Sequence, residues 1–188
     1  MEHDDNALLR DLRADYFKRN GLGADGGYSA KWVRFRFGPI TLALPNTKAR
    51  RRALPPHDLH HIATGYDTSW TGEAEIAAWE LASGCGRYVA AWVLDFSAFV
   101  IGLVIAPRRT WRAFRRGRAS DSLYAESWDE RWMDRTFGAL RQRLRIGQAR
   151  RTSVPIDAVL FAACAIPQLV VYGATIAAIV LLVRTVAL

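Results

Sequence analysis

Hydrophobic and polar positions follow a helical period over most of the chain. Within residues 1–20, one side of a predicted helix carries Leu8, Leu9, Leu12, Tyr16 and Phe17. The glycine-rich run 21–27 predicts a flexible break. Residues 28–47 interleave aromatic and charged positions, which predicts a short strand or an extended arm. Residues 124–146 return to the helical pattern, as one amphipathic helix or two.

The middle of the chain predicts two helices joined by a glycine turn. The first is expected to begin at the proline pair 55–56, because the N–H group that proline lacks has no hydrogen-bond partner in the first turn of a helix. Gly65 and the capping residues after it interrupt the pattern. A second helix is predicted from Thr71, with Glu73 in its first turn, and the run SGCG at 83–86 ends it. The pattern as a whole predicts an all-α fold.

The longest apolar run, Ala158 to Val183, contains 26 residues and no charged side chain. Roughly 20 apolar residues cross a bilayer as a helix, so this run predicts a C-terminal membrane anchor in which Pro167 is tolerated. The alternative is a buried core helix, which rarely runs so long without a charge. Arginine is concentrated before this run, at Arg141, Arg143, Arg145, Arg150 and Arg151, and only Arg184 follows it. The positive-inside rule therefore predicts a membrane-associated protein with residues 1–155 on the cytoplasmic face.

A second apolar stretch, residues 88–107, carries Asp95 near its centre. A charge is costly in mid-membrane, and the basic charge is similar on both sides of the stretch, so no membrane topology is favoured. We expect a helix in a soluble core or one that lies in the membrane interface. A helical hairpin through the membrane is the alternative.

The charge of the chain restricts which binding partners are expected. Lys and Arg outnumber Asp and Glu by 26 to 18, which indicates an anionic partner. The basic residues expected to contact membrane headgroups are Arg108, Arg109, Arg112, Arg115 and Arg116. No nucleic-acid-binding motif accompanies them, so we expect anionic lipid rather than nucleic acid.

The two cysteines, Cys85 and Cys164, do not match a disulfide or metal-binding motif. The charged N-terminus does not resemble a signal peptide.

Three of the four histidines fall within five residues, in the run HDLHH. On a helix His57 and His61 lie one turn apart on the same face, and Asp58 borders that face. Two imidazoles and a carboxylate can close on one divalent cation. Glu73, at the start of the next helix, is the candidate for a fourth ligand. His60 points about 100° away from His61, as a packing or surface residue or a donor to a ligand. A polar helix face without a metal is the alternative.

Three better-known motifs do not fit this run. Membrane di-iron enzymes need several histidine boxes, whereas the chain has 4 histidines in all. Phosphohydrolases that use a His-Asp pair need further ligands that the sequence does not offer at suitable positions. Zinc proteases of the H-E-x-x-H type carry glutamate where this chain has Asp58.

The order His57-Asp58-x-x-His61, eleven residues, then Glu73 resembles the H-D-x-x-H-x11-E signature of the Coq4 family of ubiquinone (coenzyme Q) biosynthesis proteins. The block 117–146 is similar to the end of that family. The matching positions there are Trp128, Glu130, Arg131, Trp132, Leu140, Arg141, Leu144 and Ile146. The resemblance covers about residues 28–146, and the anchor in residues 147–188 departs from the family pattern.

The resemblance implies an all-helical domain that sits on a membrane and holds a divalent metal through His57, Asp58, His61 and Glu73. It implies binding of a polyprenylated quinone precursor or similar isoprenoid lipid, and action on the ring C1 carboxylate of a polyprenylated benzoate by decarboxylation and hydroxylation. Other quinone-biosynthesis proteins are expected partners, and a homo-oligomer is expected. Zinc is the expected metal, and the nitrogen and oxygen ligands also suit Fe, Mn or Co. The alternative is a non-catalytic lipid-binding scaffold with a structural metal.

A long isoprenoid tail needs an apolar groove. The stretch 88–106 can supply one wall, with Trp92, Phe96 and Phe99 facing the lipid. The chain then divides into an N-terminal helix and break, a metal- and lipid-binding helical domain, and a basic linker with the membrane anchor. The boundaries of these three parts are 1–30, 31–146 and 147–188.

Overall fold

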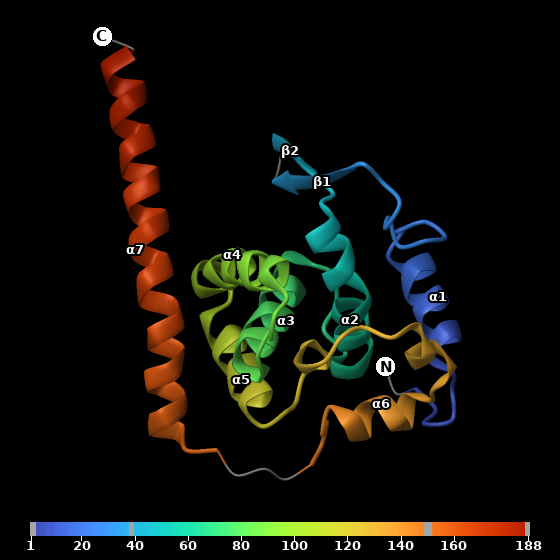
Figure 1. Ribbon diagram of the computed structural model, residues 1–188. Coiled ribbons are helices and arrows are strands. Elements are labelled where there is room, and N and C mark those ends of the chain that lie inside the picture. The colour runs from blue at the N-terminus through green and yellow to red at the C-terminus, as the bar shows by residue number, and fades with distance from the viewer. Residues whose placement is uncertain (1–2, 38–39, 149–151, 187–188) are drawn as a thin grey trace.

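A computed structural model describes residues 3–37, 40–148 and 152–186 (Figure 1). The described chain is mostly helical, as predicted, and a small antiparallel hairpin is added to the all-α pattern. The elements in chain order are α1 (Leu9–Arg19), β1 (Trp32–Phe37), β2 (Ile40–Pro45), α2 (Lys48–Thr64), α3 (Trp70–Ser83), α4 (Val89–Ile105), α5 (Pro107–Arg118), the 3-10 helices η1 (Leu123–Ala125) and η2 (Glu130–Asp134), α6 (Phe137–Arg143) and α7 (Val154–Val186).

The hairpin accounts for the alternating pattern before the histidine run. Strands β1 and β2 pair with Trp32 opposite Pro45 and Phe37 opposite Ile40. The side-chain amide of Asn46 donates hydrogen bonds to the carbonyls of Tyr28 and Ala30, at 3.3 and 2.9 Å. These bonds hold the arm before the hairpin against the start of α2. The pairing of β1 with β2 confirms the predicted strand.

Helix α2 begins at Lys48, and the predicted start at the proline pair is wrong. Thr47 caps the helix by accepting a hydrogen bond from the N–H of Arg50 at 3.2 Å, which satisfies one of the unpaired donors of the first turn. Pro55 and Pro56 lie buried inside the helix. Proline removes the N–H that would bond four residues back, toward the exposed segment 51–52, where water can replace the lost partner.

Helix α3 lies at the centre of the domain and packs against α4 and α5 (Figure 1). Two glycines allow the helices to approach closely. A Cβ added at Gly117 of α5 would lie 2.3 Å from the carbonyl oxygen of Trp79, and one at Gly102 of α4 would lie 2.7 Å from Ala74 Cβ. Because α3 carries Glu73, this tight packing fixes the position of one predicted ligand.

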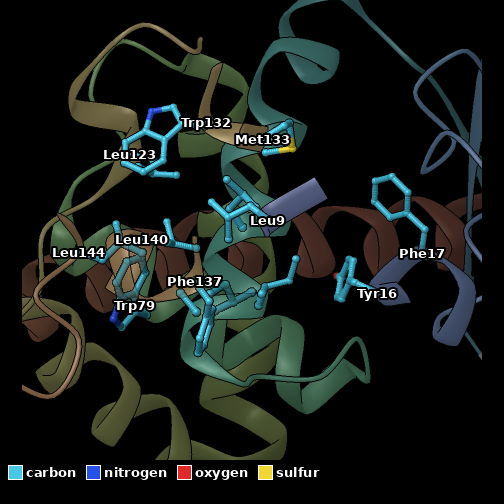
Figure 2. Close-up of a cluster of buried hydrophobic side chains, with 14 residues drawn as sticks. Leu9, Tyr16, Phe17, Trp79, Leu123, Trp132, Met133, Phe137, Leu140 and Leu144 are labelled. Carbon is cyan, nitrogen blue, oxygen red and sulfur yellow. The ribbon is translucent and has the colours of Figure 1, made fainter. Parts of the chain in front are cut away.

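The main hydrophobic cluster lies where α1, α2, α3 and the segment from η1 to α6 meet (Figure 2). Helix α1 contributes Leu9, Tyr16 and Phe17 to it, so the N-terminal helix shares a core with α2 and α3. The other labelled members are Trp79, Leu123, Trp132, Met133, Phe137, Leu140 and Leu144. The helical face predicted for residues 1–20 is therefore the face that α1 buries.

Residues 124–146 form less helix than their pattern predicts. Only α6 is an α-helix there, and η1 and η2 are single short turns. The side chains of Ser122 and Asp129 accept hydrogen bonds from the N–H groups of Tyr124 and Arg131, at 3.0 and 2.9 Å. Such local bonds compete with helix formation, which explains the irregular path.

Helix α4 buries one face against the protein, which includes Asp95 at 4% exposed, and leaves Val93 and Val104 on the other face exposed. Among the described residues, only α7 contains a span long and apolar enough to cross a membrane, Val154–Thr185. The first turns of α7 pack on the domain, where the Phe161 ring lies 5.2 Å from that of Phe99. Beyond Tyr172, whose hydroxyl donates to Ser97 Oγ at 2.8 Å, α7 extends past the domain (Figure 1).

Candidate metal centre

Helices α2 and α3 bring His57, His61 and Glu73 together. The Nε2 atoms of His57 and His61 lie 3.1 Å apart. Glu73 Oε2 lies 3.7 Å from His57 Nε2, and Glu73 Oε1 lies 3.7 Å from His61 Nε2. Each of the three residues therefore offers one donor atom to a common point, and these atoms could hold one metal ion.

The other nitrogen of each imidazole has an oxygen partner, which determines the tautomer. His57 Nδ1 lies 3.0 Å from Glu80 Oε2, and His61 Nδ1 lies 2.9 Å from the carbonyl oxygen of Tyr66. A carboxylate or a carbonyl oxygen only accepts, so each Nδ1 carries the proton. In the neutral form of both rings, the Nε2 lone pairs then face one another across 3.1 Å.

The spacing of these donors suits a tetrahedral metal. Two nitrogens bound to zinc at 2.0–2.1 Å lie about 3.3 Å apart in tetrahedral geometry. The two imidazole nitrogens, 3.1 Å apart, lie close to that value, and each has a different Glu73 oxygen 3.7 Å away. Hydrogen bonds from the ligand imidazoles to a carboxylate and to a backbone carbonyl are also the usual support of a metal-bound histidine.

The charges around the cluster favour a cation there. Burial lowers the pKa of His57, but the negative charges of Glu80 and Glu73 outweigh it, and the pKa lies well above 6.5. Burial raises the pKa of Glu73, but hydrogen bonds from His57 and His61 outweigh it, and the pKa lies well below 4.5. In the metal-free chain a proton on His57 therefore supplies the positive charge that the site requires.

Turn chemistry between the two helices positions Glu73. Gly65 ends α2 in the left-handed region, at a φ of 78° that favours glycine. Ser69 caps α3 and accepts from the N–H of Gly72 at 3.2 Å. A Cβ at Gly72 would lie 2.1 Å from the carbonyl oxygen of Asp67, so this position requires glycine. The predicted Gly65 turn and the first-turn position of Glu73 are confirmed.

Asp58 lies outside this three-residue cluster. Its carboxylate accepts a hydrogen bond from the hydroxyl of Tyr28, and the residue is 5% exposed. Burial raises the pKa of Asp58, against the opposing charge of His57. In this structure Asp58 joins α2 to the arm that precedes the hairpin.

Glu80 and His60 form a buried support that the sequence did not reveal as part of the site. His60 is fully buried; its Nε2 accepts from the N–H of Leu123 at 3.0 Å, and its Nδ1 lies 2.6 Å from Glu80 Oε1. Glu80 thus holds the imidazoles of both His57 and His60. His60 therefore has one of the roles predicted for it, that of a supporting donor, because it bonds to the carboxylate that also holds His57. The signal for Glu80 was its place two helical turns after Glu73, within an apolar stretch.

A second group of donors lies behind the first. His57, Glu80 and Asp95 each offer an atom within 4.8 Å of the others, and Cys85 Sγ lies 3.1 Å from Asp95 Oδ2. Burial and the charge of Glu80 raise the pKa of Asp95 well above its usual value. A neutral Asp95 beside an ionised Glu80 explains how α4 tolerates this residue inside the protein.

The predicted headgroup arginines on α5 divide into two sets. Arg109 pairs with Glu75 at 2.6 Å, Arg115 pairs with Asp157 at 3.5 Å, and Arg116 donates to the carbonyl of Thr64 at 2.8 Å. These three contacts hold elements of the protein together. Arg108 and Arg112 are exposed, and Arg112 Nε donates only within the helix, to the carbonyl of Arg108 at 3.3 Å.

The residues predicted to face a lipid lie on α4. Phe99 is fully buried and packs against Phe114 and Phe161, so it offers no surface to a ligand in this structure. Trp92 and Phe96 are half-buried and stack on each other with ring centres 5.9 Å apart. An apolar cavity of about 380 Å³ instead lies along other positions of α4. Its lining residues on this helix are Val89, Ala90, Val93 and Leu94.

Comparison with known proteins adds no relative. No protein-family model matches the chain, and no significant match was found among curated proteins or solved structures. The resemblance to the Coq4 family therefore rests on the residues of the sequence alone.

Proposed function

We propose that this chain is a membrane-anchored, Coq4-like metalloprotein that acts on the ring C1 carboxylate of a polyprenylated aromatic acid. The observation that carries the proposal is the convergence of His57 Nε2, His61 Nε2 and a Glu73 carboxylate oxygen on one point. The choice of substrate rests on the resemblance of His57-Asp58-x-x-His61 and Glu73 to that family. A divalent metal, with zinc expected, fits the donor set.

The exposure of the site favours chemistry over a purely structural metal. The side chains of His57 and Glu73 are 22% and 34% exposed, whereas that of His61 is fully buried. Structural zinc sites are closed by four protein ligands, and catalytic sites keep a position for water or substrate. Three protein donors with one open side fit the second kind. A metal held there would act as a Lewis acid that polarises the substrate carboxylate.

The residues of the chain have separate tasks in this proposal. His57 and His61 present unprotonated Nε2 atoms, and Glu80 and the Tyr66 carbonyl keep the protons on Nδ1. Glu73 supplies negative charge at the exposed side of the site. The domain is placed on the cytoplasmic face because arginine is concentrated before α7. Protease digestion of sealed right-side-out and inverted vesicles tests that side.

Metal content and lipid products test the proposal. The purified protein is expected to carry about one divalent metal per chain, measured by elemental analysis. The double variant His57→Ala with His61→Ala is expected to lose it while circular dichroism remains helical. Stoichiometric metal in that variant would contradict the ligand assignment.

A Glu73→Gln variant separates a ligand from a helix-start residue. Removal of a first-turn carboxylate alone costs about 0.3–1 kcal/mol of stability. As a ligand, Glu73 is expected to be needed for metal affinity as well as for product formation.

In a strain without the gene, mass spectrometry of extracted lipids is expected to show a ring-carboxylated prenyl precursor. Normal quinones in that strain would favour another lipid or the scaffold function.

A further inference from the structure

An apolar cavity separate from the metal donors lies between the hairpin, the start of α2 and one face of α4. The hairpin contributes Val33 and Leu44, and α4 contributes Val89 and Val93. The volume, about 380 Å³, is near the lower end of the range of small-ligand sites, roughly 300–1,000 Å³. Arg50 is the one charged residue among those that line it.

The guanidinium of Arg50 is incompletely satisfied. Its Nη1 donates to Asn46 Oδ1 at 3.0 Å, but its Nε is buried without a hydrogen-bond partner. It is the only such side-chain atom in the part of the chain that the structure describes. Buried polar atoms are almost always paired, so this donor calls for an acceptor that the chain does not provide.

Arg50 also lies in the electric field of two carboxylates, those of Asp58 and Glu73. Burial lowers the pKa of its guanidinium, and the negative charges of Asp58 and Glu73 oppose that shift. No ion pair joins Arg50 to either carboxylate among the described residues. An acceptor held by Arg50 would therefore lie at the apolar cavity that this residue lines.

We propose that this cavity binds a single-chain lipid that ends in a carboxylate, with the carboxylate on the Nε edge of Arg50 and the chain along Val89 and Val93. A guanidinium edge matches a carboxylate with two parallel hydrogen bonds. A phosphate monoester carries up to two negative charges, whereas Arg50 is the one charged residue that lines the cavity, so a carboxylate matches the charge better. The inference goes beyond the proposed function, because it assigns a site for an acidic lipid apart from the metal donors.

Photo-labelling tests the proposal on the full-length chain in lipid nanodiscs. The probe is palmitic acid that carries a diazirine, and peptide mapping locates the label. Labels are expected on residue 33 and within residues 44–50 and 89–94, the segments that line the cavity. Arg50→Gln is expected to reduce labelling about tenfold, the effect of losing roughly 1.4 kcal/mol of binding. Arg51→Gln, an exposed neighbour on the same helix, is the matched control and is expected to label normally.

Competition and cavity filling make the test specific. Unlabelled palmitic acid is expected to compete, and methyl palmitate to compete at least tenfold less well. Ala90→Trp, which fills the cavity, is expected to reduce labelling without loss of bound metal. Equal competition by the ester, stronger competition by hexadecyl phosphate, or normal labelling of Arg50→Gln would each overturn the proposal.

The test distinguishes the cavity from the metal site. His57→Ala with His61→Ala removes two metal donors that do not line the cavity, so this variant is expected to keep its labelling. Labelling without any bound metal in the wild type would contradict the proposed function alone. Bound metal without Arg50-dependent labelling would overturn the lipid site alone.

Discussion

Glu80 determines which nitrogen His57 presents to the candidate metal centre. Its carboxylate is fully buried and lies 3.0 Å from His57 Nδ1, so the free lone pair is on Nε2. Loss of such a supporting partner typically weakens metal affinity by about 10–100-fold. We expect that loss for Glu80→Gln, measured by competition with a chelator. Glu75→Gln, on the same helix but paired with Arg109, is expected to bind metal normally, and equal affinities in the two variants would contradict this role.

Metal binding is expected to depend on pH through His57. The metal must displace the proton on this residue, whose pKa lies well above 6.5. Apparent affinity is therefore expected to rise about tenfold per pH unit and to continue rising above pH 6.5. Isothermal titration calorimetry in buffers of different ionisation enthalpy would count the released proton. An affinity that is already constant at pH 6.5 would contradict a raised pKa.

The same shifts set the stability of the metal-free chain. The raised pKa of His57 gives stability that is complete below pH 6.5 and is lost as pH rises through the folded-state pKa. The lowered pKa of Glu73 gives stability that is present above pH 4.5 and is lost as pH falls through its folded-state pKa. The metal-free domain is therefore expected to be most stable between these limits, in the weakly acidic range.

Spacing along the helix predicted His57, His61 and Glu73 because these contacts depend on one helical turn and a short loop. It also placed Asp58 at the border of that face and predicted it as a ligand, whereas in the structure Asp58 lies outside the three-residue cluster. Tyr28, thirty residues away in sequence, bonds to Asp58 in the fold. A contact with so distant a partner leaves no periodic signal.

At the level of elements, α7 combines a packing segment with an exposed segment. Asp157 is fully buried and pairs with Arg115 and Arg118, while Phe161 packs on the aromatic rings of α4 and α5. Burial of one such aromatic side chain contributes about 1.5–3 kcal/mol. We expect a chain without residues 152–188 to have a free energy of unfolding about 3 kcal/mol lower than that of a chain without 173–188. Denaturant titration of the two chains measures this difference. Equal stability of the two would show that α7 is only an anchor.

A uniformly apolar run predicts a helix but does not predict which of its faces packs. The run that begins at Ala158 has no polar side to contrast with a buried one, so the contacts of Phe161 could not be read from the pattern. Helix α2 shows the opposite limit. Its true start depends on the cap at Thr47, whereas the proline pair gave a stronger but misleading local signal.

At the level of the whole molecule, the free part of α7 is short for a membrane span. It runs from Gly173 to Val186 and is about 20 Å long at 1.5 Å per residue, whereas the hydrocarbon core is about 30 Å thick. If α7 crosses the bilayer, the end of the domain beside it must enter the membrane interface. Figure 1 shows that the hairpin lies toward the same end of the molecule as the C-terminal half of α7.

The hairpin and the start of α4 present the apolar surface that such contact requires. Trp32 is 59% exposed and Val89 is 69% exposed, and neither packs in the core. A chain without residues 173–188 is therefore expected to keep measurable affinity for zwitterionic vesicles in flotation assays. Trp32→Glu is expected to weaken that binding about tenfold, because it removes a large interfacial aromatic side chain. Lys31→Glu changes the charge beside it but leaves the apolar surface, so its binding is expected to stay close to that of the parent chain. Equal loss in both variants would show that the residual affinity is electrostatic and that the hairpin does not enter the interface.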